Sequence, residues 1–477
     1  MGRQVTAVVG VAPPATSARG GRVVAALCFA VMTLSILQAA VVPVIPTMAR
    51  QLDVGPTAVG WVLTANLLAA AVSTPVLGRL ADQRGGRPVL IGTLVVVVAG
   101  SLLCVLAPSL PLLLVGRVLQ GTAFALFPVG VGVLRAVLDE RRLTHAIGLM
   151  SGIMAAGGGV GMVAAGVLVS GDGGYRRVFW MLLALSVVSL VVIWLTIPAV
   201  EGKERGDDRF DVIGAALLAV GLCALLLAIA EGKRWGIGAA LALAAGGLAV
   251  LSYWLRHERR CAAPLVPPRT LIGRAVTPAH VAAVLVGAAM YVQFLGIAQF
   301  VQVDPETTGY GFGVSVLEAS LLFLLPGSVA GVLSAALSGR LIHRFRANRV
   351  LIAMCAVGVA GFGVLVVAHA RPWQLVLAAV VVNVFVSGAY AALPSLLVGS
   401  VQAGDTGVVN GVNAIARIFG SSLASAAVAV LLASMTVTGT GAPSESAFTL
   451  AFWIGGIAAA SAGLFGVVHR CLSKNKN

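Results

Sequence analysis

Residues 78–90 read GRLADQRGGRPVL, a stretch that carries four charges between two long apolar runs, near 57–77 and 88–107. A helix that crosses a bilayer needs about 20 apolar residues, so each run can span a membrane and the stretch is the loop between them. Its two adjacent glycines allow a tight turn. Asp82 can pair with a cation or accept hydrogen bonds at a helix N-terminus.

The composition of the whole chain indicates a membrane protein. Of its 477 residues, 59% are hydrophobic and 10% are charged, and the mean hydropathy is +1.01. Soluble domains are about 45–50% apolar and about 25% charged, so a soluble globular enzyme is excluded. We therefore predict an all-α polytopic membrane protein. Charged or Gly/Pro breaks divide the chain into fourteen predicted spans, near 23–48, 57–77, 88–107, 110–131, 146–169, 178–198, 212–230, 236–255, 275–302, 314–337, 350–369, 373–398, 408–433 and 447–468.

The distribution of Lys and Arg predicts the topology. A net charge of +15 would suggest nucleic-acid binding in a soluble protein. An even number of spans places both termini on one side, and 24 of the 32 Lys and Arg residues fall on that side, 6 on the other and 2 within spans. Because cytoplasmic loops carry the excess of Lys and Arg, we expect a multi-pass cell-membrane protein with both termini in the cytoplasm and no nucleic-acid partner.

The chain also contains an internal repeat. Gly78-Arg-Leu recurs as Gly339-Arg-Leu, and Val89-Leu recurs as Val350-Leu, both at an offset of 261 residues. Duplication of this kind is typical of secondary transporters, so we expect two related six-helix bundles with two helices inserted between them. The predicted parts are an N-terminal tail (1–22), a first bundle (23–198), the inserted pair with its linkers (199–274), a second bundle (275–468) and a C-terminal tail (469–477).

The loop at 78–90 resembles the signature loop of the major facilitator superfamily, G-x-L-a-D-r-x-G-r-[RK]. The resemblance implies a two-bundle transporter in which this loop acts as a latch that holds one of two conformations. An ordinary positive loop that only sets topology is the alternative. The residues expected to form this gate are Gly78, Arg79, Asp82, Arg84, Gly85 and Arg87.

Further motifs extend the resemblance over nearly the full chain. The glycine-rich run that includes Gly157, Gly161 and Gly166 is similar to a helix-packing motif of exporters, although the proline of that motif is replaced here. Segments 210–214 and 231–236 resemble the inserted pair of the fourteen-span drug:proton antiporter branch. The resemblance therefore implies an efflux transporter of drugs or antibiotics.

Proton coupling is implied by a third motif, since Arg117-Val-Leu-Gln120-Gly resembles an R-x-x-Q-G motif that the superfamily links to proton transfer. An arginine at membrane depth is costly and is normally functional or paired, so a purely structural pairing is the alternative.

Antiport needs a group that alternates between charged and neutral forms. The branch usually carries an aspartate in the first span, and this chain has none there. Among its 17 carboxylates, only Glu318 is predicted inside a span, near the outer end. We expect Glu318 to take part in coupling; the alternatives are Asp82 coupled to Arg117, His280, or Glu318 as an ordinary interfacial acid.

The substrate site of such transporters lies near the midplane between the two bundles. Arg417 is a second cation inside a span, and with few acids to compensate it, it favours an anionic or carbonyl-rich substrate. Hydrogen bonding between helices is the alternative role of each polar residue there. The candidate cavity residues are Gln38, Asn66, Tyr291, Gln293, Asn383, Asn413 and Arg417.

The sequence thus predicts a transporter, not an enzyme, that exports small amphipathic compounds such as antibiotics, drugs or a secondary metabolite in exchange for protons. The alternatives are an uncoupled facilitator or importer of a small metabolite, and a non-transporting membrane sensor. Six scattered cysteines and the isolated pairs His257–Cys261 and His469–Cys471 indicate neither disulfides nor a metal site. The chain carries no phosphate-binding, zinc-hydrolase or serine-hydrolase motif, so we expect no cofactor. We expect a monomer whose partners are a small-molecule substrate, protons and the lipid bilayer.

Overall fold

A computed structural model of the protein describes residues 17–474, except for 171–173, 199–210, 262–263, 265, 267–270, 272, 274–275, 399–405 and 438–439. The described residues are almost entirely helical, and the one β feature among them is an isolated bridge between Thr436 and Pro443. The predicted all-α class is confirmed. Helices are the expected outcome, because an apolar segment in a bilayer must satisfy its backbone hydrogen bonds internally.

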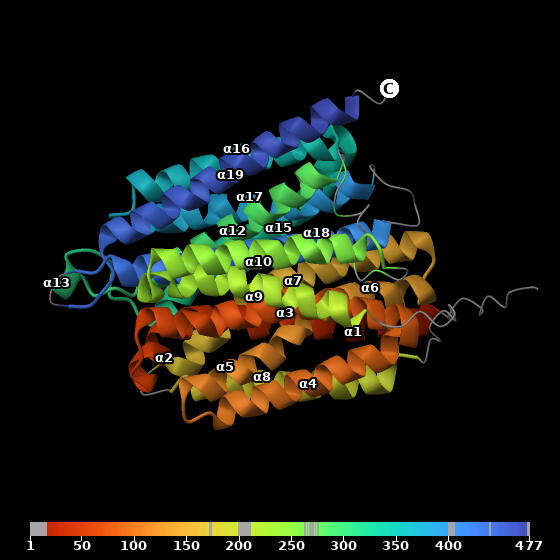
Figure 1. The fold of residues 1–477 in the computed structure, drawn as a ribbon, viewed down its shortest axis with the longest axis horizontal. Coiled ribbons are helices and arrows are strands. Elements are labelled where there is room, and N and C mark those ends of the chain that lie inside the picture. Colours follow the sequence, from red (N-terminus) through yellow and green to blue (C-terminus); the bar gives the residue numbers. More distant parts are fainter. Residues whose placement is uncertain are drawn as a thin grey trace, which may run out of the picture.

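The first half of the chain forms one bundle of long helices (Figure 1). Its segments are α1 (Ser17–Ala39), η1 (Val42–Val44), α2 (Ile45–Leu52), α3 (Pro56–Arg84), α4 (Gly86–Leu106), α5 (Leu110–Gly121), η2 (Thr122–Ala125), α6 (Leu126–Val137), α7 (Glu140–Val169) and α8 (Arg176–Thr196).

A pair of helices, α9 (Val212–Trp235) and α10 (Ile237–Glu258), separates this bundle from a second one in the sequence. The segments of the second bundle are α12 (Thr277–Phe300), α13 (Pro305–Thr308), α14 (Val316–Glu318), the π-helical η3 (Ala319–Leu324), α15 (Leu325–Phe345), α16 (Ala347–Val367), α17 (Pro372–Val398), α18 (Thr406–Ser434) and α19 (Glu445–Lys474).

The helices of the two bundles pack in the same pairs, which extends the sequence repeat into three dimensions. In the first bundle α1 packs on α7 and α8, α4 on α5 and α8, and α3 on α5. In the second bundle α12 packs on α18 and α19, α16 on α17 and α19, and α15 on α17. The contacts between bundles follow the same symmetry, because α3 packs on α18 and α15 packs on α7.

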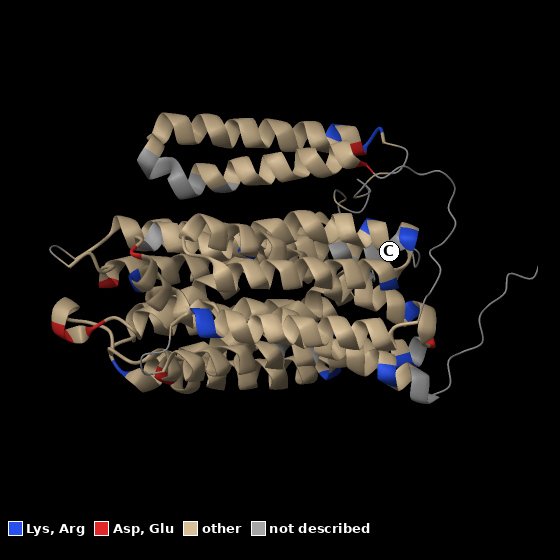
Figure 2. Ribbon diagram, turned by 90° about the horizontal axis from the view of Figure 1, so that it is seen from below, with Lys and Arg blue, Asp and Glu red and all other residues tan. Residues whose placement is uncertain are grey.

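The long helices run between two ends of the molecule. We call the end where α1 begins and α19 ends the terminal end, and the opposite end, which carries α13, the α13 end (Figure 1). Figure 2 shows that most Lys and Arg of the described chain lie at the terminal end. This asymmetry agrees with the distribution predicted from the sequence.

Twelve helical stretches of the described chain are long and apolar enough to cross a membrane. Helices α7 and α9 add shorter apolar stretches, Ala156–Val169 and Val212–Leu225, so the count of fourteen spans stays a prediction. Large apolar side chains such as Leu195 and Val367 are 71% and 82% exposed. Exposure on this scale suits a surface that faces lipid.

Small residues bring the two bundles together toward the α13 end. A Cβ added at Gly60 of α3 would lie 2.7 Å from the Cβ of Ala429 in α18. A Cβ added at Gly166 of α7 would lie 2.6 Å from the Cα of Leu317 in α14. Such distances are below ordinary van der Waals contact, so the bundles touch there without room for a larger residue.

Hydrogen bonds cross between the bundles at the same end. The hydroxyl of Thr64 in α3 donates to the hydroxyl of Ser425 in α18 at 3.0 Å. The Nε2 of Gln302, which follows α12, donates to the carbonyl of Pro43 in η1 at 3.2 Å. The α13 end is therefore closed by specific contacts.

The inserted pair lies along the junction of the two bundles. Helix α9 packs on α10 and contacts both α3 and α18, the helices that join the bundles. Figure 2 shows the pair as a separate layer beside the remaining helices. Only 11% of the residues in the apolar window of α10 are buried, so this helix presents most of its surface outward.

Candidate functional site

The loop at 78–90 forms a tight turn between α3 and α4. Gly85 closes α3 and opens α4 with a φ of +90°, a conformation that favours glycine. Arg346, 261 residues later, occupies the matching position between α15 and α16 with a φ of +71°. The tight turn predicted here is present in both bundles, and the second bundle makes it with an arginine.

The other predicted gate residues surround this turn at the terminal end. The Nη2 of Arg87 donates to the carbonyl of Trp194 in α8 at 3.0 Å, and Arg84 is exposed. No heavy atom lies within 4 Å of a Cβ added at Gly78, so a methyl group at this position would meet open space. Arg79 lies in the same turn of α3, whereas the side chain of Asp82 is outside the described residues.

Arg117 of α5 is completely buried, and its partners are oxygens of uncharged groups. Its Nε donates to the carbonyl of Val62 in α3 at 3.0 Å. Its Nη1 donates to the carbonyl of Leu37 in α1 at 3.3 Å and to Oε1 of Gln120 at 2.7 Å. The Nη2 atom makes no hydrogen bond. Arg117 therefore ties three helices together and keeps one donor available.

Two further buried residues hold this arginine in place. The Nε2 of Gln120 donates to the hydroxyl of Ser101 in α4 at 2.9 Å, which fixes the amide whose oxygen faces Arg117. The Nδ2 of Asn66 in α3 donates to the backbone carbonyl of Arg117 at 2.9 Å. One alternative given above couples Asp82 to Arg117, and the backbone distance between them bears on it. Val62, which Arg117 contacts, lies 20 residues before Asp82 on α3, and at 1.5 Å per residue that is about 30 Å.

A polar contact crosses the bundle interface beside this arginine. The Nε2 of Gln38 in α1 donates to the hydroxyl of Tyr291 in α12 at 2.5 Å. Tyr291 also interacts electrostatically with Arg117 and with Tyr390 of α17. The guanidinium of Arg417 lies 4.4 Å from the centre of the Tyr390 ring, a cation–π contact. Two cations from different bundles thus flank one pair of tyrosines.

Tyr390 is the member of this cluster that the sequence analysis missed. The chain has only 5 tyrosines, and Tyr390 lies in a predicted span, so its rarity was an available signal.

The remaining predicted cavity residues do not join this cluster through hydrogen bonds. Gln293 of α12 is completely buried, and neither atom of its amide makes a hydrogen bond. The Nδ2 of Asn383 donates within its own helix to Ala379 at 2.9 Å. The Nδ2 of Asn413 donates to the carbonyl of Ala279 in α12 at 3.4 Å.

The predicted packing glycines serve two different contacts. Added Cβ atoms at Gly157 and Gly161 would lie 3.1 Å from the carbonyl oxygen of Met32 and 2.9 Å from the Cα of Ile36, both in α1. These two glycines seat α7 on α1 within one bundle. Gly166 instead faces Leu317 of the second bundle, as described above, so the three glycines contact two different neighbours.

Glu318 lies at the start of the tenth predicted span, at the α13 end, and its side chain is exposed. It forms a capping box with Ser315: its carboxylate accepts from the Ser315 backbone nitrogen at 2.8 Å and hydroxyl at 2.9 Å. This is the ordinary chemistry of a helix start. Like Glu318, the other described carboxylates lie in loops or at helix ends.

Comparison with known proteins relates most of the chain to membrane transporters. A family model for the Major Facilitator Superfamily matches residues 27–425. The chain is 28% identical over 400 residues to a uridine/deoxyuridine transporter of Lactococcus lactis, covering 81% of each protein. It is 28% identical over 422 residues to a methylenomycin A resistance protein of Streptomyces coelicolor, covering 87% of this chain and 86% of that protein. Several other relatives are longer, and this chain covers 48% to 53% of them.

A solved structure shares the fold at low sequence identity. The POT family transporter PepTSo matches with a TM-score of 0.68 at 13% identity, over 97% of this chain and 99% of that one.

Proposed function

Because the chain belongs to the major facilitator superfamily, and is therefore a membrane transporter and not an enzyme, we propose that it exports small amphipathic compounds across the cell membrane by alternating access in exchange for protons. In this proposal the terminal end, which carries the excess of Lys and Arg, faces the cytoplasm. The methylenomycin resistance relative supports an antibiotic or a related secondary metabolite as the substrate class.

The observation that carries the proposal is the polar cluster between the bundles. The Gln38–Tyr291 hydrogen bond joins α1 of one bundle to α12 of the other, next to the buried Arg117. Polar groups at membrane depth are expensive, and a cluster at the interface of two movable bundles marks a substrate or ion pathway. When the bundles rock, this hydrogen bond must break, and a bound substrate can take over its donor and acceptor.

The charges of the cluster favour a substrate with negative charge or exposed carbonyl oxygens. Arg117 keeps one donor without a hydrogen bond, and Arg417 contacts an aromatic face and no described carboxylate. The buried Gln293 amide, also without hydrogen bonds, is a further group that a polar substrate can satisfy. A buried polar group without a partner costs about 1–3 kcal/mol, so such a substrate recovers free energy on binding.

The proposed exchange for protons needs a group that titrates during the transport cycle. Coupling through Arg117, Gln120 and Glu318 follows from the motif resemblance. His280, buried near the start of α12, and Asp82 are the alternatives.

A second candidate function is an uncoupled facilitator or importer of a metabolite. The absence of a carboxylate from the middle of any described span favours it, because antiport needs a titrating group. The uridine/deoxyuridine transporter relative suggests a nucleoside as the substrate to test first.

The deciding experiment uses purified protein in liposomes that contain a pH-sensitive dye, under an imposed proton gradient. Anionic, neutral and cationic amphipathic compounds of matched size, together with uridine, are added one at a time. We expect anionic or carbonyl-rich compounds to trigger proton movement. Compound movement without proton movement would establish the facilitator, and no movement of any compound would contradict both functions.

Variants connect the result to the cluster. Arg417→Gln should reduce transport of the anionic compounds by about ten-fold or more, since a hydrogen bond to a charged group contributes about 1.5–3 kcal/mol, and should affect neutral compounds less. Arg371→Gln, at an exposed arginine before α17, is the matched control. Glu318→Gln distinguishes the proton carriers: loss of proton movement assigns the role to Glu318, and unchanged movement leaves His280 and Asp82.

A further inference from the structure

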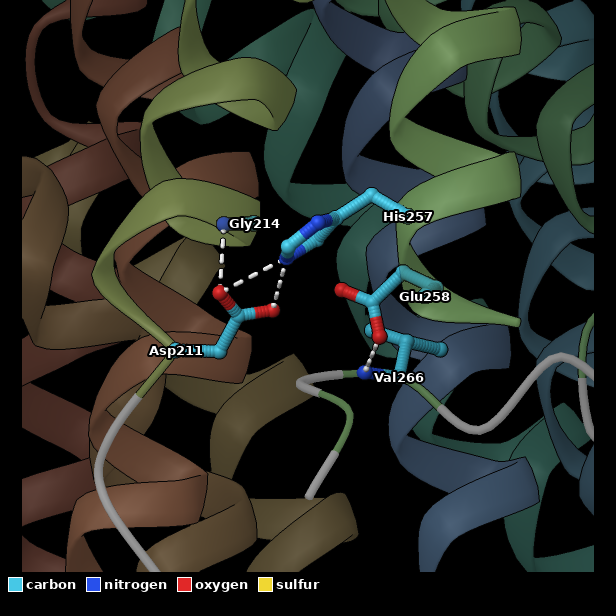
Figure 3. A network of polar contacts seen from close by, with 5 residues as sticks. All are labelled: Asp211, Gly214, His257, Glu258 and Val266. Carbon is cyan, nitrogen blue, oxygen red and sulfur yellow. Dashed lines mark hydrogen bonds and ion pairs between the residues drawn. The ribbon is translucent and has the colours of Figure 1, made fainter. Parts of the chain in front are cut away.

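Three side chains that can bind a metal ion converge where the inserted pair begins and ends. The Nε2 of His257 lies 3.0 and 3.1 Å from the two carboxylate oxygens of Asp211 (Figure 3). The Sγ of Cys261 joins them, and one donor atom from each of the three residues lies within 4.8 Å of the others. These residues lie outside the polar cluster between the bundles.

Local structure positions each of the three donors. Asp211 caps the N-terminus of α9, where its Oδ1 accepts from the backbone nitrogen of Gly214 at 2.8 Å. His257 lies in the last turn of α10. The backbone nitrogen of Cys261 donates to the carbonyl of His257 at 2.9 Å, so the chain turns once more and brings the thiol back to the imidazole. Two helix ends and one turn therefore assemble the cluster.

A buried carboxylate borders the same place. Glu258 is 1% exposed, and its Oε2 accepts from the backbone nitrogen of Val266 at 3.2 Å. Its Oε1 makes no hydrogen bond of ordinary geometry, although the indole of Trp254 interacts with this carboxylate. A Cβ added at Gly214 would clash with Asp211 and lie 2.9 Å from Oε1 of Glu258. The space between the two carboxylates thus exists only because residue 214 has no side chain.

We propose that Asp211, His257 and Cys261 bind a divalent transition-metal ion, with Zn²⁺ as the best chemical fit, and that Glu258 borders its fourth coordination position. A thiolate and an imidazole select Zn²⁺ or a similar metal over Mg²⁺ and Ca²⁺, which prefer oxygen ligands. A bound ion would cross-link the start of α9 to the end of α10.

The observed spacing is close to what a tetrahedral zinc site requires. Bonds of about 2.0–2.3 Å place neighbouring donor atoms about 3.5 Å apart. The Asp211–His257 contact must open by about half an ångström, and the widest separation in the cluster, which is at most 4.8 Å, must close by no more than about 1.3 Å. The Asp211 side chain is 5% exposed and that of His257 is 24% exposed. An ion bound here would therefore be shielded from solvent on the side of Asp211 and accessible from the side of His257.

A second His–carboxylate pair in the molecule shows how this cluster differs from a simple ion pair. At the α13 end, Nε2 of His369 lies 2.9 Å from Oε1 of Glu445, which is nearly the same His–carboxylate geometry. Among the described residues no third metal-binding side chain joins that pair. His369 is therefore the matched control for His257.

The test adds Co²⁺ to the purified full-length protein in detergent and records the visible and near-ultraviolet absorption. One equivalent of Co²⁺ should produce tetrahedral d–d bands and a thiolate charge-transfer band, and Zn²⁺ should displace it. Cys261→Ser should abolish the charge-transfer band, and His257→Asn should remove tight binding. Glu258→Gln should weaken binding by about 10–100-fold, as loss of a residue that supports metal ligands does.

Two controls leave the cluster intact and should leave the spectrum unchanged: His369→Asn, and Cys223→Ser within α9. The metal-free unfolding temperature of each variant reports whether it folds, and Zn²⁺ should raise that temperature only in proteins that keep the site. Absence of the charge-transfer band in the wild-type protein, or its persistence in Cys261→Ser, would overturn the proposal and leave an ordinary His–Asp ion pair.

Discussion

Gly60 offers a direct test of alternating access, because it touches the other bundle and leaves no room for a methyl group. In Gly60→Ala the new Cβ would lie 2.7 Å from the Cβ of Ala429, compared with about 3.4–4 Å for ordinary contact. The substitution therefore pushes α3 and α18 apart at the α13 end. It should disfavour the conformation described here and favour one in which this end is open.

The magnitude follows from the cost of overpacking. Inserting a methyl group into a filled contact costs typically about 1–3 kcal/mol. The helix-propensity gain of alanine over glycine, about 1 kcal/mol, applies to both conformations and cancels in their ratio. Gly60→Ala should therefore shift the ratio of the two conformations by about 5–150-fold.

The assay measures the distance between spin labels on the two bundles. Asp53, after α2, and Glu306, in α13, are both exposed and report on the α13 end from opposite bundles. With the native cysteines replaced, labels at these positions should give a larger population of long distances in Gly60→Ala. The double variant Gly60→Ala/Ala429→Gly, which removes the opposing methyl group, should restore the original distribution.

The control is Gly92→Ala in α4, where no heavy atom lies within 4 Å of an added Cβ. It should leave the distances unchanged. An unaltered distribution in Gly60→Ala, or a shift that Ala429→Gly does not reverse, would refute the reasoning that this contact holds the bundles closed.

Three further predictions concern stability in detergent, measured by thermal unfolding. Arg117→Lys should destabilise the protein by about 1–3 kcal/mol for each buried carbonyl left without a donor. An unchanged unfolding temperature would show that the hydrogen bonds of Arg117 do not stabilise the packing of the three helices. Gly85→Ala should lower stability by about 1–3 kcal/mol, whereas Arg346→Gly should raise it by about 1 kcal/mol; effects of equal sign would contradict the shared positive-φ turn. Burial, and secondarily the charge of Glu445, raises the pKa of Tyr310 from 10.0 to about 12. The stability linked to that phenol is present below pH 10 and is lost as the pH rises to about 12, so the wild-type protein should lose stability over this range relative to Tyr310→Phe.

Much of the fold was predictable because its signals are local. The apolar run predicted at 88–107 corresponds to α4 at Gly86–Leu106, and the run at 373–398 corresponds to α17 at Pro372–Val398. Helix boundaries in a membrane follow the change from apolar to charged or Gly/Pro-rich sequence, which requires no knowledge of distant residues. The two-bundle arrangement was predictable for the same reason, since a repeated loop is visible in the sequence.

The candidate site was predictable only in part. Arg117 and Arg417 were found because a cation inside an apolar run is itself a signal. Their partners were not, because the carbonyls of Val62 and Leu37 leave no mark on the sequence and Tyr390 lies on another helix. Glu318 was predicted as a proton carrier from its position in an apolar run, and its capping box with Ser315 was not predicted.

The sequence by itself determined the all-helical class, the internal repeat, the concentration of Lys and Arg in the loops of one side, and the family. It could do so because hydropathy, charge and motif spacing are properties of short segments. Only the tertiary structure decided which small residues join the bundles, as Gly60 meets Ala429 across 369 positions. It also brought Asp211 to His257, 46 residues away, although the sequence showed only an isolated His–Cys pair. The physical reason is that helix packing chooses partners by shape over long sequence separations, and that choice cannot be made from any one helix alone.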